Sequence, residues 1–152
     1  NIHSTANSNN YGNGDSTNKV SQNSNLSANA QEVIKLVNKE RNAAGLSALA
    51  ENSRLSEVAQ AKAEDMMKNG YFSHISPTYG SPFEMMKTFG IAYKSAGENI
   101  AKGQKTPAAV MNGWMNSSGH RTNILNASYE QIGAGFCKDS SGVAYWVQMF
   151  IR

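Results

Sequence analysis

The ten residues that precede the final arginine, GVAYWVQMFI at 142–151, constrain most strongly how this chain folds. Side chains alternate between the two faces of a β-strand. One face would carry Val143, Tyr145, Val147 and Met149, and the other Ala144, Trp146, Gln148 and Phe150. Both sets are largely apolar, which is typical of a strand that is covered on both sides. The segment therefore predicts a sheet that lies between two layers.

Two more strands are predicted before it, at 96–103 (AGENIAKG) and 130–139 (EQIGAGFCKD). The second of these is joined to the last strand by a turn of Asp, Ser, Ser and Gly at 139–142. Helix patterns dominate the earlier part of the chain. Helices that precede and cover such strands predict the α+β class, as a three-layer α/β/α sandwich around a mainly antiparallel sheet.

The first two helices are predicted from apolar spacing and from their end signals. Asn29, with Glu32 three residues later, resembles a capping box for a helix that should stop near Gly45. A second helix begins near Ser53, has a period of roughly 3.6 residues and should end at Gly70.

Three shorter helices are predicted from compact start signals. Ser81 begins the stretch SPFE, in which proline takes the first helical position and glutamate completes a capping box. Thr106 begins TPAAVMNGWM in the same way. Ser117 or Ser118 would cap a last helix that runs through Leu125.

The first 29 residues differ in composition from the rest. They are mostly Asn, Ser, Gly and Thr, so they cannot bury enough apolar surface to offset the entropy of ordering. We expect residues 1–29 to form a disordered linker or tail and residues 30–152 to form one domain. A start of this kind without Met suggests a processed or trimmed chain.

Charge and cysteine content exclude several classes of protein. The chain has 14 Lys and Arg against 11 Asp and Glu, a net charge of +3, with no basic run that would mark a nucleic-acid face. No apolar stretch approaches a membrane span. The single cysteine, Cys137, excludes an internal disulfide and a multi-cysteine zinc site, and we expect it to be a small packed residue.

Three residues of the predicted domain are candidates for chemistry: His74, Glu98 and His120. Two imidazoles and a carboxylate suit zinc with an open position, and they equally suit acid/base catalysis without metal. Spacing alone does not bring them together. Instead, His120 could help to start a helix, His74 could form a hydrogen bond within its loop, and Glu98 could face solvent on an edge strand. Glu84 is better explained as the capping-box partner of Ser81.

Five motifs then occur in a fixed order: FSHISP, GENIAKG, NGWMNSSGHRTNIL, YEQIGAG and YWVQMF. This series resembles the CAP superfamily, which comprises cysteine-rich secretory proteins, antigen 5 and pathogenesis-related proteins. The similarity spans about 30–152, and the form GHRTNIL with no disulfide cysteines resembles the bacterial, SCP-like extracellular branch.

The resemblance implies an α/β/α sandwich with a central cleft lined by two His and two Glu. His74, Glu98 and His120 match three of the four, and the histidines would be the ligands of zinc or another divalent cation. The second Glu of the animal and plant proteins corresponds to Ser117 here. Glu98 is the candidate catalytic residue, but the site has no spare carboxylate to act as base if Glu98 is a ligand or an orienting partner, unless Glu84 approaches the cavity from its short helix.

The resemblance leaves three functions open. The first is a secreted, non-enzymatic module at or outside the bacterial cell envelope, which binds a metal, a small ligand, a cell-wall component or a protein partner. The second is a metal-assisted hydrolase of peptides or cell-wall material, with His74 and His120 on zinc and Glu98 as ligand or base. The third is a lipid-binding protein, whose Met and aromatic residues are equally explained as core.

Overall fold

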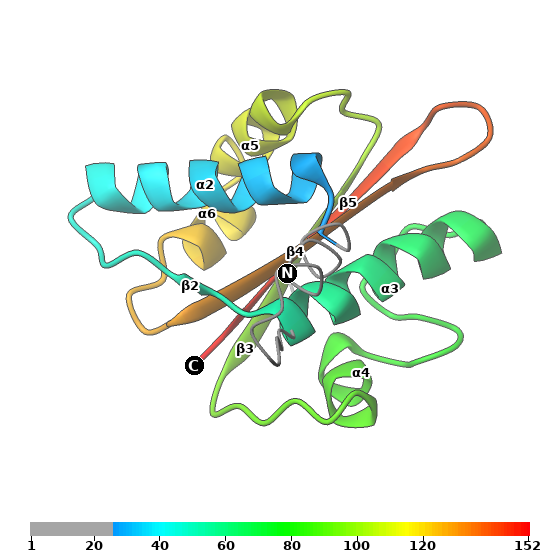
Figure 1. Ribbon diagram of the computed structural model, residues 1–152, viewed down its shortest axis with the longest axis horizontal. Helices are drawn as coiled ribbons and strands as arrows, with labels where there is room; N and C mark the ends of the chain where they lie inside the picture. The colour runs from blue at the N-terminus through cyan, green and yellow to red at the C-terminus, as the bar shows by residue number, and fades with distance from the viewer. Residues whose placement is uncertain (1–25) are drawn as a thin grey trace, which may run out of the picture.

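A computed structural model describes residues 26–152, so most of the predicted tail lies outside the described residues. The helices are α2 (Ala28–Ala43), α3 (Ser53–Asn69), α4 (Pro82–Thr88), α5 (Pro107–Met115) and α6 (Ser118–Ile124). The strands are β2 (Ala50–Glu51), β3 (Ala96–Lys102), β4 (Gln131–Lys138) and β5 (Ala144–Ile151) (Figure 1). Within residues 26–152, none of the helices is both long and apolar enough to cross a bilayer.

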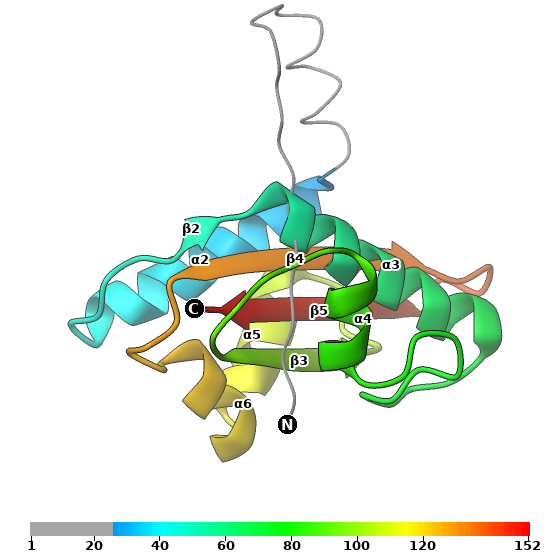
Figure 2. The same ribbon diagram turned by 90° about the horizontal axis from the view of Figure 1, so that it is seen from below.

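The strands form a single sheet in the order β2-β4-β5-β3. β5 pairs antiparallel with β4 on one side and with β3 on the other, and only the two-residue β2 runs parallel to its neighbour. Figure 2 shows β4, β5 and β3 side by side. β3 is therefore an edge strand, and this edge carries Glu98. The mainly antiparallel sheet agrees with the prediction, which did not include β2 because two residues carry no readable pattern.

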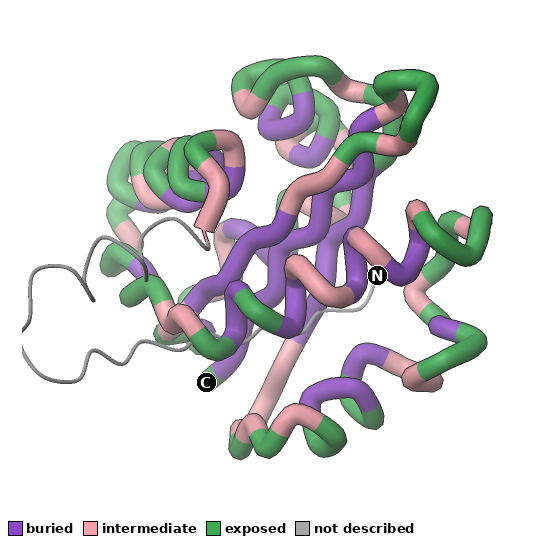
Figure 3. The backbone as a smooth tube through the Cα atoms, turned by 45° about the vertical axis from the view of Figure 1, so that its right-hand side comes forward, coloured by how far each residue is buried: buried purple, intermediate pink, exposed green. Residues whose placement is uncertain are grey.

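Helices cover both faces of the sheet, as Figure 1 shows. One apolar cluster joins α2, α5 and α6 to Trp146 and Phe150, and the other joins α3 and α4 to Tyr145, Val147 and Met149. Every residue of β5 is buried, and the buried positions run through the centre of the molecule in Figure 3. The predicted three-layer α/β/α sandwich is confirmed. The methionines at 66, 85 and 86 are fully buried core residues.

Two glycines let α3 lie directly on β4. A Cβ at Gly133 would be 2.4 Å from the backbone nitrogen of Ser56, and a Cβ at Gly135 would be 2.4 Å from that of Gln60. Real Cβ atoms essentially never come so close to backbone. The alternation of glycine in GAG is thus a packing requirement, and it fixes the height of α3 above the sheet.

Most of the predicted helix ends are confirmed. Ser81 and Glu84 form a reciprocal capping box, and Thr106 accepts a hydrogen bond from the backbone of Ala109. α3 ends at Gly70, which adopts the left-handed conformation with φ of 64°. A glycine there avoids the steric cost that a Cβ would have.

One predicted cap is wrong, and another lies at the predicted residue but lacks the capping hydrogen bond. α2 begins at Ala28 and is capped by Ser27, whose side chain accepts from the nitrogen of Ala30, so Asn29 lies inside the helix. Residues 28 and 29, which were assigned to the tail, belong to α2. α6 begins after Ser117, but the Ser117 side chain makes no capping hydrogen bond. Its hydroxyl contacts the ring of His120 instead.

Candidate functional site

His74 and Glu98 are in direct contact. His74 lies in the loop between α3 and α4, and its Nδ1 is 2.7 Å from Oε1 of Glu98 on β3. The Glu98 side chain is completely buried, whereas 23% of the His74 side chain is exposed. The buried Glu98 carboxylate thus contacts Nδ1 of the His74 ring, which is partly exposed to solvent.

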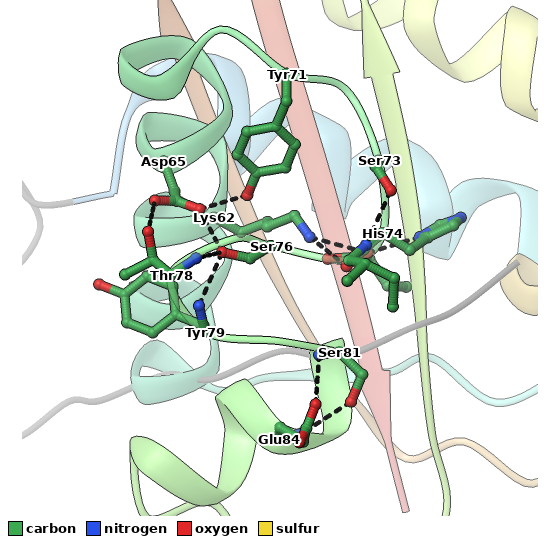
Figure 4. A network of polar contacts seen from close by, with 12 residues as sticks. Lys62, Asp65, Tyr71, Ser73, His74, Ser76, Thr78, Tyr79, Ser81 and Glu84 are labelled. Atoms are coloured by element: carbon green, nitrogen blue, oxygen red, sulfur yellow. Dashed lines mark hydrogen bonds and ion pairs between the residues drawn. The ribbon is translucent and has the colours of Figure 1, made fainter.

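A buried lysine, which sequence reasoning missed, joins this pair. Lys62 on α3 is 1% exposed, and its Nζ donates a hydrogen bond of 2.5 Å to the backbone oxygen of His74. The same Nζ is 3.9 Å from Oε1 of Glu98. Burial raises the pKa of Glu98 and lowers that of Lys62, while their mutual attraction opposes both shifts. Lys62 therefore contacts both partners of the His74–Glu98 pair. Figure 4 shows its side chain reaching from α3 to His74.

One turn further along α3, Asp65 contacts the same loop. Its carboxylate is 7% exposed and accepts hydrogen bonds from Ser76 Oγ at 2.6 Å and Thr78 Oγ1 at 2.9 Å. Tyr71 and Asn69 donate to it as well. Burial raises the pKa of Asp65, but these hydrogen bonds stabilise the anion and hold the pKa below its ordinary value. Asp65 was also missed by sequence reasoning.

His120 lies in the first turn of α6. Its Nδ1 is 2.8 Å from Oγ of Ser117. Burial lowers the pKa of His120, and the charge of His74 lowers it further. The two histidines are therefore electrostatic neighbours, although within residues 26–152 His120 makes no hydrogen bond with His74 or Glu98.

Asn99, the neighbour of Glu98 on β3, connects the strand to the His120 segment. Its Nδ2 donates to the backbone oxygen of His120 at 3.1 Å and to Gln148 Oε1 at 2.8 Å. Its Oδ1 accepts from Asn123 of α6 at 2.7 Å. Successive strand residues point to opposite faces. The edge strand therefore contacts the His74 loop through Glu98 and the His120 helix through Asn99.

The sequence pattern of α3 could have indicated that Lys62 and Asp65 are buried. Leu55, Val58, Lys62 and Asp65 recur at intervals of three or four residues, which places them on one face of α3, and all are buried. A charged residue at an apolar position of such a pattern predicts a buried partner, because an unpaired buried charge is costly.

The donor chemistry suits a divalent cation only in part. Each histidine has its Nδ1 engaged, by Glu98 or by Ser117, so Nε2 is the nitrogen left for a ligand. In the part of the chain that the structure describes, no group of three or more His, Cys, Asp or Glu is placed to hold a metal ion. Glu98 thus lies behind the His74 ring and Ser117 behind the His120 ring, and Nε2 is the open nitrogen of each.

The remaining candidates have structural roles. Oε1 of Glu84 accepts from the backbone nitrogen of Ser81 at 2.8 Å, as the capping-box interpretation predicted. Cys137 is half-buried and packs against the α3 side of the sheet. Burial raises the pKa of its thiol to about 11. A thiol of that pKa is protonated at neutral pH and is a poor nucleophile.

Residues 34–150 match the model of the CAP, or cysteine-rich secretory protein, family. The chain belongs to this family. The Bacillus subtilis protein YkwD is 54% identical over 128 residues, which cover 84% of this chain and 49% of that protein. The B. subtilis membrane protein YlbC is 36% identical over 122 residues, or 80% of this chain and 34% of that protein. The chain thus spans about half of one curated relative and a third of the other.

Among solved structures, an extracellular SCP-domain protein from Bacillus anthracis has a TM-score of 0.77 and 35% identity. The similarity covers 82% of this chain and 40% of that one. These relatives place the chain in the bacterial, SCP-like branch of the CAP family.

The CAP resemblance also identified Ser117 as the residue at the position of the missing second Glu. In the structure its hydroxyl is the partner of His120 Nδ1. A neutral hydroxyl therefore contacts this ring, whereas a carboxylate contacts His74. The two imidazoles of this CAP domain consequently have unequal environments.

Proposed function

We propose that this CAP domain is a binding module without hydrolytic activity, which holds a metal ion or a polar ligand through His74 and His120. The contact between His74 Nδ1 and Glu98 Oε1, at 2.7 Å, is the observation that carries the proposal. A carboxylate on one ring nitrogen fixes the tautomer and the orientation of an imidazole, and it leaves the other nitrogen for a ligand.

The engagement of Glu98 favours binding over hydrolysis. A hydrolytic base needs a carboxylate that can take a proton from water. Oε1 of Glu98 already contacts His74 and lies near Lys62, and the side chain is fully buried. Glu84 is engaged in its capping box. These contacts support an orienting role for Glu98 in preference to the catalytic role considered from the sequence.

Zinc is the cation that this donor set suits best, with His74 and His120 as its protein ligands. Bound zinc would supply a Lewis-acidic centre with positions open to water or to a ligand atom. His120 would contribute its Nε2, because its Nδ1 is occupied by the Ser117 hydroxyl. Because only two protein side chains would hold the ion, we expect weaker zinc binding than in sites with three or four protein ligands.

We further propose that the module acts outside the cytoplasm, at the bacterial cell envelope or beyond it. The support is the relative from B. anthracis, 35% identical, which is an extracellular protein. A cell-wall component, a small ligand or a protein partner would then complete the coordination. The relatives are longer than this chain, so the ligand of the whole protein could also contact regions outside this domain.

Isothermal titration calorimetry with zinc tests the proposal. Wild-type protein should bind one ion with an affinity on the order of micromolar, and His74→Ala and His120→Ala should each abolish the heat. His3→Ala, which changes a histidine outside the described residues, is the matched control and should bind as the wild type does.

Two other experimental results would favour a different function for this domain. Peptidoglycan fragments and peptide libraries, incubated with zinc-loaded protein and analysed by mass spectrometry, should remain intact. Cleavage that His74→Ala abolishes would refute the non-enzymatic proposal and favour the hydrolase. Lipid that co-purifies stoichiometrically, with no zinc heat in the wild type, would favour the lipid-binding alternative.

A further inference from the structure

The loop at 70–81, which carries His74, has little regular structure of its own. Ser76 and Gly80 exchange two backbone hydrogen bonds, of 2.8 and 2.9 Å, and form its one isolated bridge. Phe72 and Ile75 near the histidine are 47% and 56% exposed, so they contribute little burial. The loop must therefore be held by contacts outside itself if the His74 ring is to stay on Glu98.

The buried face of α3 supplies these contacts at two points one turn apart. Lys62 Nζ donates to the backbone oxygen of His74, and the Asp65 carboxylate accepts from Ser76 Oγ and Thr78 Oγ1. Figure 4 shows Lys62 and Asp65 reaching from the helix to the loop on either side of Ser76. A loop tied to one helix in this way moves with that helix, which Gly133 and Gly135 seat on the sheet.

The buried Ser76 hydroxyl requires a hydrogen-bond acceptor. Its Oγ accepts the backbone N–H groups of Thr78 and Tyr79, each at 2.9 Å. A hydroxyl has two acceptor lone pairs and one donor, so the remaining O–H can only donate. Asp65 receives it at 2.6 Å, in a site where Ser76 is 3% exposed. Charge-assisted hydrogen bonds of this kind are stronger than neutral ones.

We propose that Asp65, acting through the Ser76 hydroxyl, is a positioning residue that holds the 70–81 loop so that His74 Nδ1 stays on Glu98. This role deepens the proposed function and rests on it for the ligand of His74. Asp65 itself contacts neither the His74 ring nor Glu98 within the described residues, so its effect passes through the loop.

The key variant is Ser76→Ala, with Ser73→Ala as the matched control. Ser73 lies in the same loop next to His74, and among residues 26–152 its hydroxyl accepts only the nearby backbone N–H of Ile75, at 3.1 Å. Two readouts apply to both proteins. The first is NMR of the His74 Nδ1 proton and of the exchange rate of the Gly80 amide. The second is the zinc dissociation constant from calorimetry.

In Ser76→Ala we expect the His74 Nδ1 proton to broaden beyond detection and the Gly80 amide to exchange about tenfold faster or more. Loss of the support of a metal-binding histidine should weaken zinc binding by about 10- to 100-fold. Ser73→Ala should match the wild type in all three quantities. Asp65→Ala should repeat the Ser76→Ala result, and Ser76→Ala decides alone if Asp65→Ala does not fold.

A His74 proton and a Gly80 amide that behave in Ser76→Ala as in the wild type would overturn the inference. Unchanged zinc affinity beside a lost His74 signal would overturn it too, because positioning would then not matter to binding. Failure of the wild type to bind zinc refutes the metal proposal alone, and in that case the NMR readouts decide the positioning role.

Discussion

Removing the buried charge of Lys62 should destabilise this domain strongly. The Lys62 side chain is 1% exposed and Glu98 is 0% exposed, so water does not screen their interaction. Lys62→Met keeps most of the side-chain volume but leaves the Glu98 carboxylate without its cation, and it removes the donor to the His74 carbonyl. Loss of one partner of a buried pair typically costs about 3–5 kcal/mol, and we expect about 3 kcal/mol because Met packs well in an apolar layer.

Urea unfolding followed by circular dichroism at pH 7 measures this loss, with Lys68→Met as the control. Lys68 lies on the same helix, and its side chain is 67% exposed, so its variant should stay within about 0.5 kcal/mol of the wild type. The double variant Lys62→Met/Glu98→Gln should regain about 2 kcal/mol, because a neutral amide no longer needs the cation. A Lys62→Met protein as stable as the control, or strict additivity in the double variant, would refute this reasoning.

Burial, packing and charge lead to three further predictions. Gly135→Ala should cost at least about 2 kcal/mol in thermal unfolding, since its Cβ would meet α3 backbone 2.4 Å away, whereas Gly113→Ala, in an uncrowded position of α5, should stabilise slightly. The pKa of Asp65 is lowered in the folded protein, so its carboxylate contributes fully to folding stability above its ordinary pKa of 3.8, and this contribution is lost as the pH falls through the folded pKa. The difference in the free energy of unfolding between the wild type and Asp65→Ala should therefore be smaller at pH 3 than at pH 7. Cys137, with a pKa of about 11, should react with iodoacetamide at pH 7 roughly a hundredfold more slowly in the folded than in the unfolded protein.

The layered fold could be predicted because its signals are local and redundant. Every residue of β5 is buried, as the apolar character of both its faces implied. SPFE contains a serine, a proline and a glutamate whose geometries all favour the same helix start, and the structure has that capping box. Where independent physical effects agree within four residues, the sequence alone is sufficient.

The first helix was predicted less well because two caps compete there. Ser27 and Asn29 are both good N-cap residues, and Glu32 lies three residues after Asn29, as a capping box requires. The structure uses Ser27, and the helix from Ala28 buries Ala30, Val33 and Ile34 against the sheet. These buried residues lie inside the helix whichever of the two residues caps it, so the apolar pattern could not distinguish Ser27 from Asn29.

The candidate site lay beyond local reasoning for a related physical cause. The residues that contact one another around His74 come from α3, the loop and β3, and Glu98 is 24 positions from the histidine. Spacing carries no information about such contacts, so the family resemblance, not the pattern, indicated that His74 and Glu98 share a site. Lys62 and Asp65 could have been found from the pattern, because both are charged residues on the apolar face of a predicted helix. Charged residues at such positions imply a buried polar network, and here that network lies beneath the loop that presents the histidine.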